Sequence, residues 1–305
     1  MKPPLGLRAV FAELPDGYEV VRGRRGWLAF EVTARATLAA SGFDPDGTER
    51  LPASDLAGRA ELGSIVAGSE RWVVRRFHHG GLLRALGEHL FLRPARPFRE
   101  LVLAETLRAA GFATPRVVAA RAVRSWGLTW SLTLVSVRVE GLLDGQALLD
   151  ALGRGALTLA ERRALLAAAG TLVGRLHRAG FVHADLTPNN LLLDARTGSG
   201  WVLDLDGGRF VAALRAEDRH ANLRRLQRAV EKRTRRRAAG RPLLTRGDRL
   251  RFLRAYGRAL GADADWRADW RGIARQERRA ARWHRLVWWL EERLGGAWRG
   301  SHTPP

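Results

Sequence analysis

The residues best suited to chemistry lie in a short segment of the second half of the chain. It reads His-Ala-Asp-Leu-Thr-Pro-Asn-Asn over residues 183–190 and is followed by three leucines. Nineteen residues beyond Asp185, a second apolar run is followed directly by Asp204. Asp and Asn favour turns on their own account, but a turn does not require this whole ordered set. The order of the residues therefore indicates a reactive site.

Carboxylates and amides in this order suit phosphoryl transfer. The reaction needs a carboxylate near the acceptor hydroxyl, and groups that hold a divalent cation across the phosphates of the nucleotide. We predict that Asp185 is the catalytic carboxylate and that Asn190 and Asp204 are ligands of Mg²⁺, which prefers hard oxygen donors. Asp206 is a candidate further acid at the same site.

The apolar pattern and the turns predict the elements that position these residues. Residues 1–57 predict short strands and loops. The rest of the first half holds a strand hairpin, one helix and two more strands, and after Gly141 the pattern becomes helical. The predicted ranges are strands at 62–67 and 71–77, a helix at 98–110, strands at 115–123 and 128–139, and a long helix at 159–178. A small β-rich unit therefore precedes a helical one.

The segment 183–190 resembles the catalytic loop of the protein kinase superfamily, whose pattern is H-x-D-L-x-x-x-N. Asp204 stands where that superfamily has the aspartate of its D-F-G motif. The resemblance implies an α+β, two-lobed protein-kinase-like fold, with a small β-rich N-lobe that contains one helix and a larger helical C-lobe. We expect residues 1–55 to be an N-terminal extension, residues 56–140 the nucleotide-binding N-lobe and residues 141–305 the C-lobe.

The resemblance also assigns the nucleotide-binding residues of the N-lobe. Gly58 and Gly63 bound a Gly-Arg-Ala-Glu-Leu-Gly segment where a hairpin over the phosphates is expected, although the full G-x-G-x-x-G is missing. Arg75 occupies the strand position at which the superfamily has a lysine, and Glu100 on the next helix is its expected partner. Arginine binds phosphate through two N–H groups but is not interchangeable with lysine. A catalytically weak, kinase-like binding protein therefore stays open as an alternative.

Four segments together resemble the 3-deoxy-D-manno-octulosonic acid (Kdo) kinases, which are grouped with the heptose kinases of the lipopolysaccharide core. The matching segments are residues 73–82, 97–101, 183–186 and 203–206. In that family an arginine-rich strand followed by Gly-Gly-Leu is usual, as is D-F-D in place of D-F-G. Leu205 here replaces the phenylalanine, and Asn189 replaces a frequent histidine. The resemblance covers roughly residues 56–210.

This resemblance implies an ATP- and Mg²⁺-dependent phosphotransferase with an alcohol group as acceptor. The expected acceptor is the Kdo sugar of a lipid A-linked glycolipid, phosphorylated by a peripheral protein at the cytoplasmic side of the bacterial inner membrane. The chain has no apolar run of the ~20 residues that a membrane-spanning helix needs. A heptose or another small molecule is the alternative acceptor, because the motifs specify the donor chemistry and not the acceptor.

The net charge of +21 indicates which kinds of binding partner the protein can have. Such a charge suits nucleic acid, an anionic membrane surface or an acidic substrate. Arginine is spread over the whole chain and no helix-turn-helix, zinc or aromatic RNA-binding signature accompanies it, so we predict no nucleic acid. Cysteine is absent, which excludes a disulfide scaffold, a thiolate zinc site and a cysteine nucleophile.

Two features of the last third are open to a membrane reading. The basic run 224–237 contains one acid, Glu231, and either a solvated helix face or a membrane-facing segment explains it. The end of the chain is rich in tryptophan, and an apolar stripe from Trp283 to Leu294 predicts a packed helix. Trp288 and Trp289 lie off that stripe and are candidate interfacial anchors.

Overall fold

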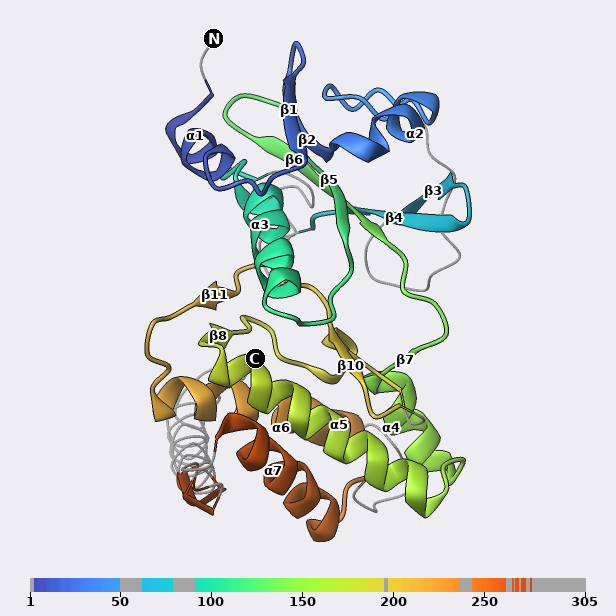
Figure 1. Ribbon diagram of the computed structural model, residues 1–305, viewed down its shortest axis with the longest axis vertical. Helices are drawn as coiled ribbons and strands as arrows, with labels where there is room; N and C mark the ends of the chain where they lie inside the picture. The colour runs from blue at the N-terminus through green and yellow to red at the C-terminus, as the bar shows by residue number, and fades with distance from the viewer. Residues whose placement is uncertain are drawn as a thin grey trace, which may run out of the picture.

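The computed structural model describes residues 3–49, 62–78, 91–194, 197–235, 243–261, 265, 267, 268, 270–272 and 275. They form two lobes, a smaller one built on a six-stranded sheet and a larger one built mainly of helices (Figure 1). The predicted two-lobed α+β architecture is confirmed. Gly58 and the tryptophan-rich end at 281–305 lie outside the described residues.

The N-lobe sheet is antiparallel, with strand order β1-β2-β5-β6-β4-β3. Its strands are β1 (Tyr18–Arg22), β2 (Gly26–Glu31), β3 (Leu62–Ala67), β4 (Glu70–Arg76), β5 (Val117–Arg124) and β6 (Trp130–Val137). The predicted hairpin is β3–β4, in which Leu62 lies opposite Arg75 and Gly63 lies opposite Val74. Arg75 therefore lies on β4, which is paired on both sides, with β3 and with β6.

Within the described part of the N-lobe, three α-helices accompany this sheet, where the sequence predicted one. They are α1 (Leu5–Phe11), α2 (Arg35–Ala40), which follows a short 3₁₀ turn, and α3 (Arg96–Ala109). The buried face of α3 repeats at helical spacing through Phe98, Leu101, Ala104 and Leu107, and packs against the sheet. Helix α3 is the predicted one, and it begins two residues early because Pro97 is well suited to a first turn.

The segment 1–55, predicted as an extension before the N-lobe, contributes two strands to the sheet of that lobe. Strand β2 reads Gly-Trp-Leu-Ala-Phe-Glu, is mostly buried, and pairs with β5 from Gly26↔Val123 to Phe30↔Ala119. Because β2 is covered on both faces, its apolar residues run on without the alternation that marks a half-exposed strand. The short strands predicted within residues 1–57 are therefore present, but their bounds and their place in the N-lobe sheet could not be predicted from periodicity.

The C-lobe is a helical body with short strands along the edge that faces the N-lobe (Figure 1). Its helices are α4 (Gly145–Arg154), α5 (Leu159–Arg178), α6 (Ala216–Arg235) and α7 (Arg246–Leu260), and its strands are β7 (Leu143–Asp144), β8 (Phe181–Val182), β9 (Leu191–Leu193), β10 (Gly200–Val202) and β11 (Arg209–Phe210). Helix α5 has the predicted bounds, and a capping box of Thr158 and Glu161 fixes its start. Among the described helices, every one is too short or too polar to cross a bilayer.

Helices α5 and α7 pack closely because glycines line their contact. A Cβ atom on Gly174 would lie 2.4 Å from the Tyr256 carbonyl oxygen and 2.8 Å from the Ala259 Cβ. A Cβ atom on Gly170, one turn earlier, would lie 2.3 Å from the Phe252 carbonyl oxygen. The α5–α7 pair supports residues 183–190, because β8 follows directly from α5 and leads into that segment.

We expect Gly174→Ala to lower the free energy of unfolding by about 1–3 kcal/mol, because the added methyl group must push α7 away from α5. Gly247→Ala is the matched control, since this helical glycine meets nothing closer than 3.7 Å and alanine is the better helix former. Denaturant unfolding of both variants measures the difference. Equal stabilities of the two would contradict the close packing.

Candidate active site

The catalytic segment 183–190 leaves β8, turns through a 3₁₀ helix at Pro188–Asn190 and enters β9. His183 is buried at its start. Its Nε2 atom lies 2.9 Å from the Leu203 carbonyl oxygen, and its Nδ1 atom accepts a hydrogen bond from the Asp185 N–H at 3.0 Å. Burial lowers the pKa of His183, which suits the neutral ring that these two contacts require. His183 therefore shapes the loop and ties it to the segment before Asp204.

Helix α6 holds the same loop from the other side through Asn222. This buried amide accepts a hydrogen bond from the His183 N–H at 3.1 Å and donates one to the His183 carbonyl oxygen at 2.9 Å. Its Oδ1 atom also lies 3.3 Å from the His177 Nε2 atom, and the His177 Nδ1 atom lies 3.0 Å from the Tyr256 hydroxyl. A buried polar chain thus links the loop to α5, α6 and α7.

Three of the predicted site residues lie together on the two adjoining loops. The Asn190 amide nitrogen donates to the Asp185 carbonyl oxygen at 2.8 Å, and the Leu203 N–H donates to the Asn190 carbonyl oxygen at 2.9 Å. These bonds bring Asp185, Asn190 and Asp204 to one place. Asp204 has a backbone φ of 54°, a left-handed conformation that aspartate tolerates better than most residues.

Arg75 joins the two lobes at this place. Its Nη2 atom lies 2.6 and 2.5 Å from the two carboxylate oxygens of Glu100 on α3, so the predicted ion pair is present. Its Nη1 atom lies 2.8 Å from Asp204 Oδ1, in the C-lobe. The Glu100 side chain is 5% exposed, whereas that of Asp204 is 41% exposed. One guanidinium therefore has a buried partner and a solvent-facing partner.

A second arginine, not singled out in the sequence, completes the cluster. Arg96 at the start of α3 contacts both carboxylate oxygens of Asp206, with Nε 3.2 Å from Oδ1. Its guanidinium lies over the ring of Phe91 at 4.8 Å, which holds it in place. Three carboxylates thus surround two guanidinium groups, and the excess negative charge lies where a cation would be bound.

That excess charge acts on the most buried acid. Burial, together with the charges of Asp204 and Asp206, raises the pKa of Glu100 to about 7, against the opposing effect of Arg75. Because the folded-state pKa is above the ordinary value, the protonated form is favoured in the folded protein. The stability that this gives is present at low pH and is lost as the pH rises through about 7.

The donor set fits Mg²⁺. Asn190 uses its amide nitrogen for Asp185, so its amide oxygen is the atom that can reach a metal beside the Asp204 carboxylate. Mg²⁺ takes few protein ligands besides phosphate and water, and an amide with a carboxylate meets that requirement. Among the described residues, no group of three or more histidines and acids is arranged to hold a metal unaided.

The remaining predicted residues are placed in part. Gly63 lies in β3 beside the strand of Arg75, and its role at the phosphates stays a prediction.

Three residues at the site were not predicted from the sequence, namely Asn222, Arg96 and Arg225. The Arg225 Nη1 atom lies 2.8 Å from Asp185 Oδ1. Asn222 and Arg225 belong to α6, about forty residues beyond the loop, and no local sequence pattern predicts their contacts with it.

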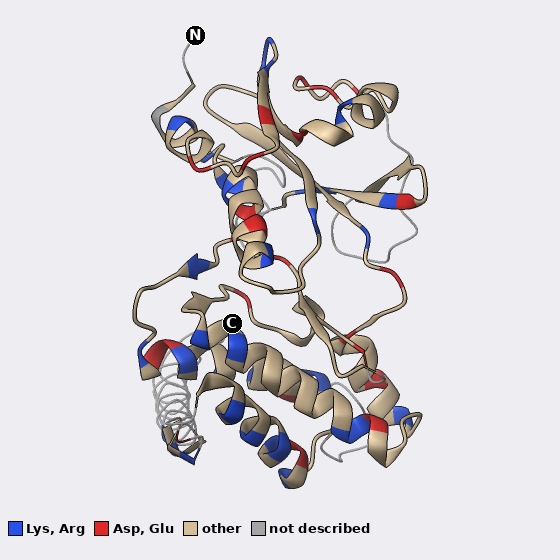
Figure 2. Ribbon diagram, in the orientation of Figure 1, with Lys and Arg blue, Asp and Glu red and all other residues tan. Residues whose placement is uncertain are grey.

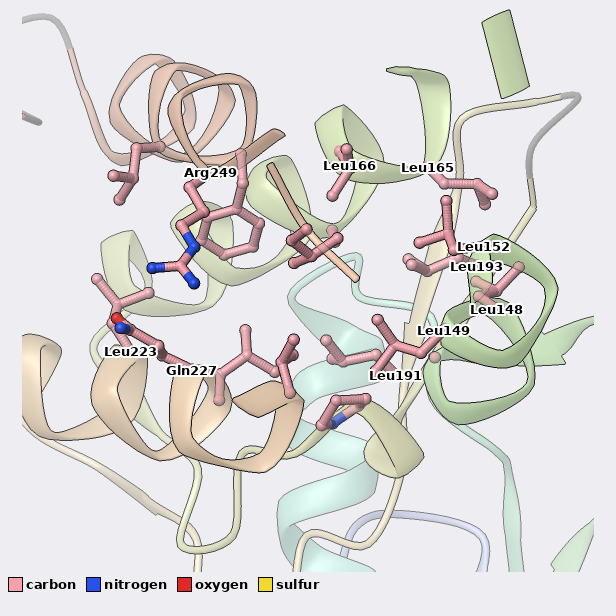
Figure 3. A pocket seen from close by; sticks show the side chains of 18 of the residues that line it. Leu148, Leu149, Leu152, Leu165, Leu166, Leu191, Leu193, Leu223, Gln227 and Arg249 are labelled. Atoms are coloured by element: carbon pink, nitrogen blue, oxygen red, sulfur yellow. The ribbon is translucent and has the colours of Figure 1, made fainter. Parts of the chain in front are cut away.

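A separate apolar pocket of about 150 Å³ lies inside the C-lobe, behind the catalytic loop (Figure 3). Leucines of α4, α5, β9 and α6 line it, among them Leu149, Leu165, Leu191 and Leu223, and Gln227 and Arg249 lie at one side. Pro188 of the loop also lines it. Its lining suits apolar groups and not phosphates, so the charged cluster around Arg75 stays the predicted nucleotide site.

We expect Glu100→Gln to remove a pH-dependent loss of stability. Wild type should lose about 1–3 kcal/mol relative to the variant between about pH 5 and pH 8, because only wild type must ionise the buried carboxyl. Denaturant unfolding at both pH values measures this, and other titrating groups cancel in the comparison. Parallel pH profiles for the two proteins would contradict the raised pKa.

Comparison with known proteins identifies relatives over most of the chain. A family model described as the lipopolysaccharide kinase (Kdo/WaaP) family matches residues 48–256. A 3-deoxy-D-manno-octulosonic acid kinase of Stenotrophomonas maltophilia (strain K279a) is 32% identical over 198 residues, covering 62% of this chain and 74% of that protein. One from Xanthomonas oryzae pv. oryzae (strain PXO99A) is 32% identical over 213 residues, covering 68% and 81%.

The fold has a solved counterpart as well. A structure of WaaP in complex with acyl carrier protein matches with a TM-score of 0.56 and 22% identity, covering 84% of this chain and 98% of that one. This likeness confirms the predicted protein-kinase-like fold, and the family match confirms the resemblance seen in the motifs. The chain belongs to the lipopolysaccharide kinase (Kdo/WaaP) family, and it is a kinase.

Proposed function

We propose that this kinase transfers the γ-phosphate of ATP to a hydroxyl of the Kdo sugar on a lipid A-linked acceptor. The observation that carries the proposal is the meeting of Asp185, Asn190 and Asp204 on two hydrogen-bonded loops. The names of the curated relatives, which are Kdo kinases at 32% identity, support the choice of acceptor. A lipopolysaccharide-type acceptor is also what the family description suggests.

Each of the central residues has a distinct task in this proposal. Asp185, with its side chain 56% exposed, receives the proton of the acceptor hydroxyl as the new bond to phosphorus forms. Asn190 and Asp204 hold Mg²⁺, and His183 and Asn222 keep the loop in its shape. Mg²⁺, when bound with ATP, neutralises charge on the phosphates and links them to the protein. Gly63, and Gly58 outside the described residues, lie in the segment proposed to cover the phosphates.

Arg75 takes the task of the lysine that other kinases have. One edge of its guanidinium contacts Glu100, and the Nη1 atom, which contacts Asp204, would be available to phosphate if Asp204 held Mg²⁺. A guanidinium has a planar fork of donors, so one edge can pair with a buried carboxylate while another N–H binds a phosphate. Arg75 is therefore compatible with an active enzyme.

We further propose that the protein works at the cytoplasmic side of the inner membrane, on an anionic membrane surface. The membrane-bound acceptor and the net charge of +21 support this. Lys and Arg are spread over both lobes rather than gathered in one patch (Figure 2). Two arginines of the basic run, Arg225 and Arg233, pair with Asp185 and Asp150 of the protein itself, so they do not serve the membrane.

We expect the purified protein, given ATP and Mg²⁺, to phosphorylate a Kdo-bearing lipid A glycolipid and to leave protein substrates untouched. Mass spectrometry of the glycolipid should find one added phosphate, located on Kdo by fragmentation. Transfer to a heptose-bearing acceptor, with none to Kdo, would replace the proposed acceptor by the alternative one.

Variants of the two carboxylates accompany that assay. Asp185→Asn should lower kcat by about 100-fold or more and leave Mg²⁺–ATP affinity unchanged, because only the base is lost. Asp204→Asn should also stop turnover but raise the Mg²⁺ requirement, because a metal ligand is lost. Asp16→Asn, an exposed acid of the N-lobe, is the control. Near-normal turnover by Asp185→Asn would contradict the assignment of Asp185 as the catalytic base, whereas nucleotide binding without turnover by wild type would favour the binding-protein alternative.

A further inference from the structure

The side chain of Arg225 lies beside the catalytic carboxylate without a task in the scheme above. Its Nη1 atom is 2.8 Å from Asp185 Oδ1, and the two side chains are 46% and 56% exposed. An exposed ion pair of this kind adds little to stability. Its place at the reacting group is therefore the property to explain.

Arg225 is held in this place by the same helix that holds the loop. Asn222 lies three residues earlier on α6, on the same face, and binds both the N–H and the carbonyl oxygen of His183. The distance from α6 to the loop is thus fixed two residues before Asp185. The buried contact thus fixes the backbone from which the Arg225 side chain reaches Asp185.

The charge beside Asp185 has a chemical consequence. A guanidinium that stayed on the carboxylate would occupy the oxygen that has to face the acceptor hydroxyl. The segment carries no arginine or lysine between residues 183 and 190, and among the described residues Arg225 is the one whose guanidinium pairs with Asp185, so an incoming acceptor meets this cation beside the carboxylate. A second anion, brought by the acceptor, would draw the guanidinium away from Asp185.

We propose that Arg225 forms an anion subsite that binds the carboxylate of the acceptor sugar. This inference rests on the proposed function, in which the acceptor is a sugar acid. The acceptor carboxylate replaces Asp185 as partner of the guanidinium, which places the sugar hydroxyl next to Asp185 and leaves Asp185 available for its proton. No bond is made or broken at Arg225. A neutral sugar such as a heptose lacks the group that makes this exchange, so the subsite selects sugar acids.

The test compares two acceptors in steady-state kinetics: the Kdo-bearing glycolipid and its analogue in which the Kdo carboxyl is reduced to CH₂OH. Arg225→Gln should raise the KM of the natural acceptor by about 10–100-fold, as expected for loss of a charge-assisted hydrogen bond pair, with the KM of ATP unchanged. On the reduced analogue, already a poor substrate of wild type, the same change should alter KM less than about threefold. Arg225→Lys should restore part of the loss, because lysine keeps the charge but not the fork.

Arg228→Gln is the matched control, an exposed arginine on the same helix, and should behave as wild type on both acceptors. An equal loss on both acceptors would overturn the subsite, since Arg225 would then act on Asp185 itself or on the phosphoryl group in transfer. Wild type that phosphorylates only acceptors without Kdo would overturn the proposed function, and the subsite with it. Thermal melts of all variants should agree, because Arg225 is half exposed.

Discussion

The contact on which the site depends is the bridge that Arg75 makes between Glu100 and Asp204. Glu100 belongs to α3 in the N-lobe and Asp204 to the loop after β10 in the C-lobe, so a single guanidinium fixes the relation of the two lobes at the cluster. Arg96 repeats the arrangement with Asp206. Removing the guanidinium would leave the Glu100 carboxylate buried without a partner, which costs on the order of several kcal/mol of stability in such pairs. Each partner therefore constrains the position of the others. Three acids and two arginines leave one negative charge in excess when Glu100 is ionised, which suits the proposed cation site.

The loop below the bridge depends on backbone contacts and not on side-chain charge. His183 and Asn222 bind the main chain on either side of Asp185, and both are buried. This leaves the Asp185 side chain exposed while its backbone is fixed, which is what a group that meets a substrate requires. The close packing of α5 on α7 gives that loop a rigid base, because β8 leads directly from α5 into it.

Much of this arrangement could be predicted from the sequence. The order of Asp185, Asn190 and Asp204 indicated the site, and Arg75 with Glu100 followed from the strand and helix that carry them. Helix α5 and the β3–β4 hairpin were predicted because their patterns are local. Short strands were predicted within residues 1–57, but neither the bounds of β2 nor its place in the sheet was, since a strand buried on both faces lacks alternation and its partner β5 lies nearly a hundred residues away.

Asn222 and Arg225 could not be predicted for a related reason. Helical periodicity shows which face of α6 is buried but not which loop that face meets, and the loop lies about forty residues earlier in the chain. Arg96 could not be singled out because the chain is rich in arginine, and only the contact with Asp206 in the structure distinguishes it from the others. Residues that support a site through tertiary contacts are thus the ones that a sequence motif leaves out.

The central claim is that an arginine binds the nucleotide phosphates where a lysine is usual. Calorimetry of Mg²⁺–ATP binding to wild type, Arg75→Lys and Arg75→Ala tests it most directly. We expect Arg75→Ala to raise the Kd of Mg²⁺–ATP by about tenfold or more, which is a loss of about 1.4 kcal/mol or more of binding free energy. Arg75→Lys should recover part of that affinity. Wild-type affinity in Arg75→Ala, with the fold intact by thermal melting, would contradict it.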